Sequence, residues 1–237
     1  MRAWSLCLTG AFALGAMGPD LGGQEVTLDE GTFTIYEAGA EVGTETFSIR
    51  VSGSGAERRV VAGARLHVAS GPGARDVQTT LELRGADEHV VLYTVQVSGS
   101  EPQDVRYEED GPGRLSMIRR TSVGERAREM RAAPGLVILD SGVVHHLYFA
   151  GVRLRAGATT VPTLVPIAGE SGSVTLRPLG AGSVEIAGSS VDAQHMRVES
   201  STGAALDVWM DAEGRLLLVE RAAERGPAFR AVRTRLP

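Results

Sequence analysis

Hydrophobic and polar residues alternate with a period of two along most of this chain. Phe33 and Ile35 share one side of the first such run, and Phe47 and Ile49 share one side of the next. Residues two apart point to the same face of a β-strand, so these runs predict half-buried strands. The two strands form a hairpin across the Gly-containing loop at 37–43.

The same alternation recurs towards the C-terminus. It predicts further strands at 64–68, 77–84, 91–97, 105–108, 115–123, 126–131, 174–177, 183–186, 193–199, 205–210, 215–221 and 229–235. Gly, Pro, Ser and Asp separate these runs, which indicates polar turns. Many short strands at close spacing predict an antiparallel meander, and its apolar face must either close on itself or leave an apolar concavity.

One segment departs from this period. Asp140 and Ser141 can cap a helix, and the apolar residues that follow recur at helical spacing. These apolar positions are Val143, Val144, Leu147, Tyr148 and Val152. We therefore predict one short helix over 142–152, followed by an extended segment at 159–166 whose two prolines are incompatible with helix.

The N-terminus has the features of a secretory signal peptide. Arg2 precedes a short apolar run, and Gly18-Pro19-Asp20 follows it. We expect residues 1–22 to be this signal peptide and residues 23–237 to form a single β domain, with a break at 169–172 as the second choice. The run is too short for a membrane span, so we expect an exported protein, periplasmic or secreted, with no span in its mature part.

The composition excludes several kinds of chemistry. All 24 basic residues are Arg, against 29 acidic residues, and the chain contains neither Lys nor Asn. Schiff-base and phosphate-loop chemistry both need Lys, so they are excluded. Cys7, the only cysteine, lies inside the apolar run of the leader, which excludes thiol catalysis and cysteine metal sites in the mature chain.

The most suggestive polar group is Asp140, Ser141, His145 and His146, which together suggest a hydrolase. Adjacent residues on a helix point roughly 100° apart, so the two histidines are poorly placed to share one metal ion. The chain also lacks G-x-S-x-G and H-E-x-x-H motifs. We favour a non-enzymatic protein with no catalytic residues, no metal and no cofactor. The Arg-rich stretch at 114–131 lacks stacking aromatics, so nucleic acid is not an expected partner.

Three stretches carry a resemblance to a known group: "GTFTIYEAGAEVGTETFSIR", "LVILDSGVVHHLYFAG" and "DVWMDAEGRLLLVE". They resemble uncharacterised exported bacterial proteins whose fold is similar to that of the lipoprotein-localisation carriers LolA and LolB. The resemblance implies a mainly β fold: a single curved antiparallel sheet, or an open, unfinished barrel, with one short helix. In the carriers the concave apolar face holds acyl chains.

The expected function is therefore to bind a hydrophobic ligand, such as a lipid, an acyl chain or an apolar protein segment, on the concave face. The expected ligand-binding residues are Phe33, Ile35, Phe47 and Ile49 in the wall, and Val144, Leu147 and Tyr148 on the covering helix. These side chains are equally explained as plain core. The alternatives are an envelope interaction module that pairs with a protein through a sheet edge, and the hydrolase described above.

Overall fold

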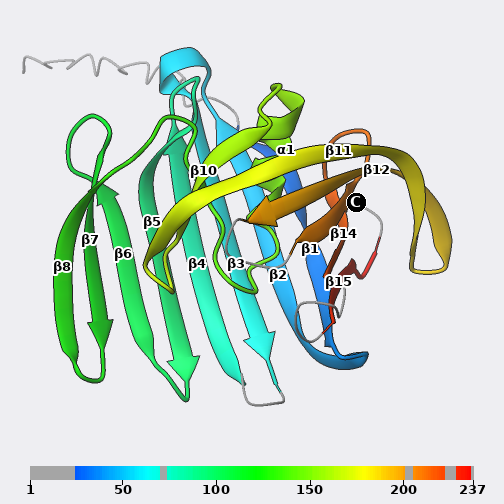
Figure 1. Cartoon of the computed structure of the whole chain (residues 1–237), viewed down its shortest axis with the longest axis horizontal. Helices are drawn as coiled ribbons and strands as arrows, with labels where there is room; N and C mark the ends of the chain where they lie inside the picture. Colours follow the sequence, from blue (N-terminus) through cyan, green and yellow to red (C-terminus); the bar gives the residue numbers. More distant parts are fainter. Residues whose placement is uncertain (1–24, 70–73, 201–204, 222–227, 236–237) are drawn as a thin grey trace, which may run out of the picture.

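The computed structural model describes residues 25–69, 74–200, 205–221 and 228–235. A single fifteen-stranded sheet runs through them, in the order β8-β7-β6-β5-β4-β3-β2-β1-β15-β14-β13-β12-β11-β10-β9 (Figure 1). Neighbours in the sheet are neighbours in sequence, except where β1 meets β15. The predicted fold, a mainly β, antiparallel and open sheet with one short helix, is confirmed. The predicted signal peptide at 1–22 lies outside the described residues.

The first half of the chain supplies eight strands and a short 3₁₀ helix. They are β1 (Val26–Glu37), β2 (Ala40–Ser52), η1 (Gly55–Glu57), β3 (Arg59–Val68), β4 (Arg75–Arg84), β5 (His89–Gly99), β6 (Gln103–Glu109), β7 (Arg114–Thr121) and β8 (Gly124–Arg131). All neighbouring strands here are antiparallel.

The second half supplies seven strands and the helix. They are β9 (Val137–Ile138), α1 (Leu147–Arg155), β10 (Thr160–Val165), β11 (Glu170–Ile186), β12 (Ser189–Ser200), β13 (Leu206–Met210), β14 (Leu216–Arg221) and β15 (Phe229–Arg233). The strands predicted at 174–177 and 183–186 are one long strand, β11, whose register against β12 shifts between Pro178 and Gly180. The extended segment with two prolines contains β10, beside the two-residue edge strand β9.

The first hairpin turns more tightly than the sequence predicts. The β1–β2 ladder continues to Glu37 and Ala40, so only Ala38 and Gly39 remain in the turn. Both have positive φ, 49° and 82°, which is the conformation of a two-residue turn that follows the twist of the strands. The loop predicted at 37–43 is therefore largely strand.

The helix begins later than predicted. It covers Leu147–Arg155, not 142–152, and the residue before it, His146, provides no side-chain cap. The prediction that Asp140 and Ser141 cap it is wrong. The Asp140 carboxylate binds elsewhere, as described below, and Gly142 has a φ of +82°, which interrupts any helix at that position.

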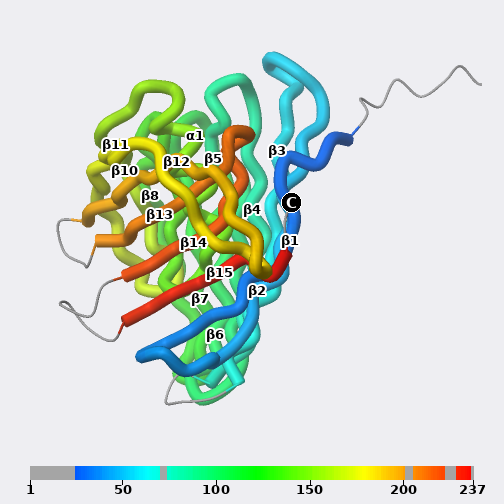
Figure 2. The backbone as a smooth tube through the Cα atoms, turned by 90° about the vertical axis from the view of Figure 1, so that its right-hand side faces the viewer, coloured from blue at the N-terminus to red at the C-terminus, as the bar shows by residue number. Residues whose placement is uncertain are grey.

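The sheet curves so that its two ends approach each other. β1–β8 form one broad layer, and β10–β12 cross in front of it with α1 between them (Figures 1 and 2). Side chains, not strand pairing, bridge the gap: Arg119 donates to the carbonyl of Pro166 at 2.7 Å, and Arg128 donates to that of Gly169 at 2.9 Å. The sheet is thus an unfinished barrel, with β8 and β9 as its edges.

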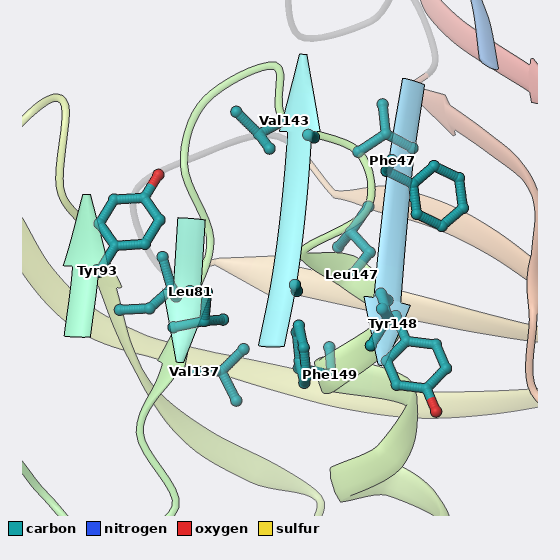
Figure 3. Packing of buried hydrophobic residues seen from close by; sticks show 14 of the residues in the cluster. Phe47, Leu81, Tyr93, Val137, Val143, Leu147, Tyr148 and Phe149 are labelled. Carbon is teal, nitrogen blue, oxygen red and sulfur yellow. The ribbon is translucent and has the colours of Figure 1, made fainter. Parts of the chain in front are cut away.

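The apolar core fills the concave side of this sheet. Figure 3 shows Val137, Leu147 and Phe149 lying over the face that carries Phe47 and Leu81. All five belong to one buried cluster that joins the sheet to α1 and to the chain preceding it. Burying a large side chain of this kind contributes about 1.5–3 kcal/mol. In the described part of the chain, α1 is too short to cross a bilayer, and no other helix reaches spanning length.

Candidate functional site

The chain between β9 and α1, residues 139–146, crosses the concave face; we refer to it as the connecting segment. Its first part contacts β5 and its second part contacts β2, through the polar side chains described next. It therefore spans the middle of the sheet, and its position is set by a few buried hydrogen bonds.

Glu45 on β2 anchors the second part of the connecting segment. Its side chain is fully buried, and its two oxygens accept three hydrogen bonds. The donors are the Val144 amide at 2.7 Å, the His145 amide at 2.8 Å and the His145 Nδ1 at 2.9 Å. A buried carboxylate needs such donors, because it has lost its water. Glu45, on the distant strand β2, thus accepts hydrogen bonds from the amides just before α1, a role that a residue close in sequence usually has as a helix cap.

Asp140 anchors the first part of the connecting segment. Tyr93 on β5 donates its hydroxyl to Asp140 Oδ2 at 2.6 Å, and the Ile167 amide donates to Oδ1 at 2.7 Å. Burial raises the pKa of Asp140 to about 6, although both hydrogen bonds oppose the shift. Burial, followed by the nearby charge of Asp140, raises the pKa of Tyr93 well above its usual value.

His145 and His146 lie side by side with ring centroids 4.4 Å apart, and both are fully buried. The Asp140 amide donates to His146 Nδ1 at 3.3 Å, which places the His146 proton on Nε2. Burial and then the neighbouring His145 lower the pKa of His146 well below its usual value, so this ring is neutral. Among the described residues, neither Nε2 atom has a hydrogen-bond partner.

A cavity of about 290 Å³ lies beside this cluster, and we call it the end cavity. The connecting segment and α1 form one wall, and the ends of β1, β13, β14 and β15 form the other. Its apolar lining consists of Leu139, Val143, Val144, Leu147, Leu206, Val219 and Phe229. Its polar lining consists of Glu37, Arg75, Asp140, Ser141 and Arg221, with Gly142 beside them. An apolar interior with a few polar groups is typical of a small-molecule site.

The structure brings two of the seven predicted ligand-binding residues to the end cavity, Val144 and Leu147. The other five are buried elsewhere in the core, namely Phe33, Ile35, Phe47, Ile49 and Tyr148. Phe47 lies between two rings: it stacks on Phe33, with centroids 5.3 Å apart, and on His145 at 6.0 Å. Its face of the sheet is thus occupied by protein side chains.

The four hydrolase candidates are divided between two environments. Asp140 and Ser141 line the end cavity, whereas His145 and His146 are sealed in the core. In the described chain no hydrogen bond joins the Ser141 hydroxyl to either imidazole, and its side chain is exposed. The geometry does not assemble a nucleophile with a base.

A buried ion pair joins the first and last strands, β1 and β15. Arg233 on β15 lies 2.9 Å from the Asp29 carboxylate on β1, and both side chains are nearly inaccessible. Arg233 also donates to the carbonyls of Leu216 and Glu30, and the Leu216 amide donates to Asp29. Burial raises the pKa of Asp29, and the Arg233 charge opposes that shift. This pair supports the β1–β15 junction and contributes no lining to the cavity.

Glu45 and Arg75 are two of the polar site residues that the sequence prediction missed. Glu45 lies two residues before Phe47 and four before Ile49, on the same face of β2, so an acidic residue occupies a position that should face the core. That conflict is a sequence signal for a buried polar site. The sequence around Arg75 contains no such conflict. Arg75 lines the cavity because the connecting segment, distant in sequence, folds against it.

In the described residues no group of three or more His, Cys, Asp or Glu side chains could hold a metal ion. Comparison of the chain with protein-family models, with curated proteins and with solved structures finds no match.

Proposed function

We propose that this chain is an exported, non-enzymatic protein, periplasmic or secreted, that binds a hydrophobic ligand in the end cavity. The observation that carries the proposal is the end cavity itself, an apolar space of about 290 Å³ that opens at one end of the sheet. A lipid, an acyl chain or an apolar protein segment is the class of ligand that suits it. The open curved sheet with one helix is also the arrangement implied by the resemblance to exported proteins whose fold is similar to that of LolA and LolB.

The size of the end cavity limits the ligand. An engineered apolar cavity of about 150 Å³ holds one benzene molecule, so about 290 Å³ holds roughly twice as many heavy atoms, close to an alkyl chain of about ten carbons. Each buried CH₂ contributes about 0.8 kcal/mol, and the loss of ligand freedom offsets part of the total. We expect a Kd on the order of 10–100 µM, near the affinity of a single acyl chain for a membrane.

The placement of the predicted wall residues refines the proposal. The middle of the concave face is filled by the connecting segment and by core side chains, so binding there would require the segment to move. The end cavity needs no such movement, because Val144 and Leu147 already line it together with strand residues. The ligand site is therefore at one end of the sheet.

The alternative of partner binding through a sheet edge has less support. The edge strand β8 carries five charged side chains: Glu125, Arg126, Arg128, Glu129 and Arg131. Charged edges are the usual protection of a sheet against pairing with another strand. One of these side chains, Arg128, is already bonded to the turn before β11.

Fluorescence titration with the neutral apolar dye N-phenyl-1-naphthylamine tests the proposal. The dye should become brighter on adding the purified protein, and decanol should displace it. Val143→Phe places a larger side chain in the end cavity and should weaken dye binding at least tenfold. Val123→Phe is the matched control, because Val123 is 92% exposed in the β7–β8 turn.

Two results would contradict the proposal. One is a wild-type protein that neither brightens the dye nor binds decanol. The other is a Val143→Phe protein that remains folded by circular dichroism and binds the dye as tightly as Val123→Phe does.

A further inference from the structure

The end cavity has an arginine at its mouth whose hydrogen-bonding capacity is largely unused. Arg75, at the start of β4, lies against the connecting segment, where its Nη2 donates to the Ser141 carbonyl at a long 3.4 Å. Its Nε is buried and has no hydrogen-bond partner among residues 25–69, 74–200, 205–221 and 228–235. A guanidinium has five N–H donors, and in the described part of the chain only this one has an acceptor.

This guanidinium lies against the connecting segment. A Cβ built on Gly142 would lie 3.2 Å from Arg75 Nη2, so the guanidinium rests directly on the glycine backbone. Many other arginines of the chain are paired with carboxylates, for example Arg197 with Asp207 at 2.9 Å and Arg58 with Glu88 at 2.9 Å. No carboxylate of the described residues lies within 4 Å of the Arg75 side chain.

The other charges around the end cavity leave this arginine available. Arg221 on β14 adds a second positive charge to the lining. Asp140 also lines the cavity and interacts electrostatically with Arg119 and Arg75, but its two oxygens accept hydrogen bonds from Tyr93 and the Ile167 amide. Glu37, exposed at the end of β1, is the remaining carboxylate.

We propose that the ligand of the end cavity is an anionic amphiphile: a single alkyl or acyl chain ending in a carboxylate or phosphate, with that headgroup bound to the Arg75 guanidinium. The inference rests on the proposed function and specifies its ligand. The chain lies against Val144 and Leu147, and the headgroup reaches the rim, where Arg75 meets Ser141 and Gly142. The planar guanidinium matches two oxygens of a carboxylate or phosphate, which gives two parallel charge-assisted hydrogen bonds.

Four ligands with the same ten-carbon chain test this inference: decanoate, monodecyl phosphate, decanol and decyltrimethylammonium. Each displaces N-phenyl-1-naphthylamine from the protein at pH 7.5, where decanoate is ionised. Wild type should bind decanoate and decyl phosphate about tenfold more tightly than decanol, and decyltrimethylammonium more weakly than decanol. The relative affinities of decanoate and decyl phosphate distinguish a fatty-acid ligand from a phosphate-bearing one.

Arg75→Gln should reduce the decanoate-to-decanol affinity ratio from about ten to near one. Arg65→Gln is the matched control: it removes the same charge from an exposed position on β3, and the ratio should stay near ten. Because the readout is a ratio within one variant, a loss of folded protein cannot imitate it. Arg75→Lys keeps the charge without the planar fork, so an intermediate ratio is expected.

The failure of this inference differs from the failure of the proposed function. If the dye and decanol bind but decanoate binds no more tightly, or Arg75→Gln keeps the tenfold ratio, the anionic ligand is refuted and hydrophobic binding stands. If none of the four ligands binds, either by displacing the dye or by direct calorimetric titration, both are refuted.

Discussion

Replacement of Glu45 tests whether the connecting segment is held by the strand beneath it. Glu45→Ala would leave three buried donors without an acceptor: the Val144 amide, the His145 amide and the His145 Nδ1. An unsatisfied buried donor costs about 1–3 kcal/mol. The buried carboxylate's own desolvation cost disappears with it and offsets part of this sum. We expect a net loss of about 3–5 kcal/mol, because the cost of three unsatisfied donors exceeds the desolvation cost that is recovered.

Glu45→Gln separates the charge from the shape of this side chain. The glutamine oxygen can accept from one or two of the three donors, but its NH₂ group must then face another N–H. We expect it to destabilise the fold by about 1–3 kcal/mol, less than Glu45→Ala. Glu41→Ala is the control on the same strand, because Glu41 is exposed and its side chain makes no hydrogen bond to the part of the chain that the structure describes. It should change stability by no more than about 0.5 kcal/mol.

Urea unfolding measures these differences, and amide hydrogen exchange locates them. In Glu45→Ala the peptide containing the Val144 and His145 amides should lose protection, while peptides from β11 and β12 should change less. If Glu45→Ala unfolds at the same urea concentration as Glu41→Ala, or protection at Val144 and His145 is unchanged, Glu45 does not hold the segment.

Two further predictions concern buried charges. Because the pKa of Asp140 is about 6 in the folded protein and about 3.9 in an unfolded chain, the folded state holds the extra proton between these values. The free energy of unfolding should therefore fall by up to about 3 kcal/mol as the pH rises from about 4 to about 6. Urea unfolding at each pH measures this fall, and Asp140→Asn should remove the contribution of this group to it. The prediction is refuted if the free energy of unfolding depends on pH in the same way in the variant and the wild type. Arg233→Ala should destabilise the fold by about 3–5 kcal/mol, because it leaves Asp29 buried without its partner. Arg230→Ala is the control on the same strand: it breaks an exposed ion pair and should cost about 1 kcal/mol or less. Equal thermal denaturation midpoints for the two variants would refute this prediction.

The alternation of hydrophobic and polar residues predicted the β fold well, because one face of nearly every strand is buried. It could not predict how far each strand extends. β1 and β2 are longer than their apolar runs, since the ladder continues until Ala38 and Gly39 take positive φ. β11 was divided in two because its register shifts at Pro178 and Gly180, and a shift of this kind interrupts the alternation without ending the strand.

The start of the helix depends on contacts that no local pattern contains. Asp140 and Ser141 form a plausible cap in sequence, yet the amides at 144 and 145 bind Glu45, about a hundred residues away in the chain. Asp140 in turn binds Tyr93. Long-range polar partners replaced the local cap, and this moved the helix start to Leu147.

The candidate site was predictable only in part. Val144 and Leu147 were identified from helical spacing, and they do line the end cavity. The opposite wall comes from the ends of strands far apart in sequence, such as Leu206 and Phe229, which meet only when the C-terminal strands pair with β1. Each of these residues looks like ordinary core in its own strand, so a period analysis cannot assign them to a cavity.

Ligand contacts observed directly would test hydrophobic binding in the end cavity most sharply. The measurement is a nuclear Overhauser experiment on methyl-labelled protein with decanol. We predict cross-peaks from the alkyl chain to the methyl groups of Val144 and Leu147. Binding without those cross-peaks, or cross-peaks confined to exposed side chains such as Val123 and Leu179, would show that the cavity is not the ligand site.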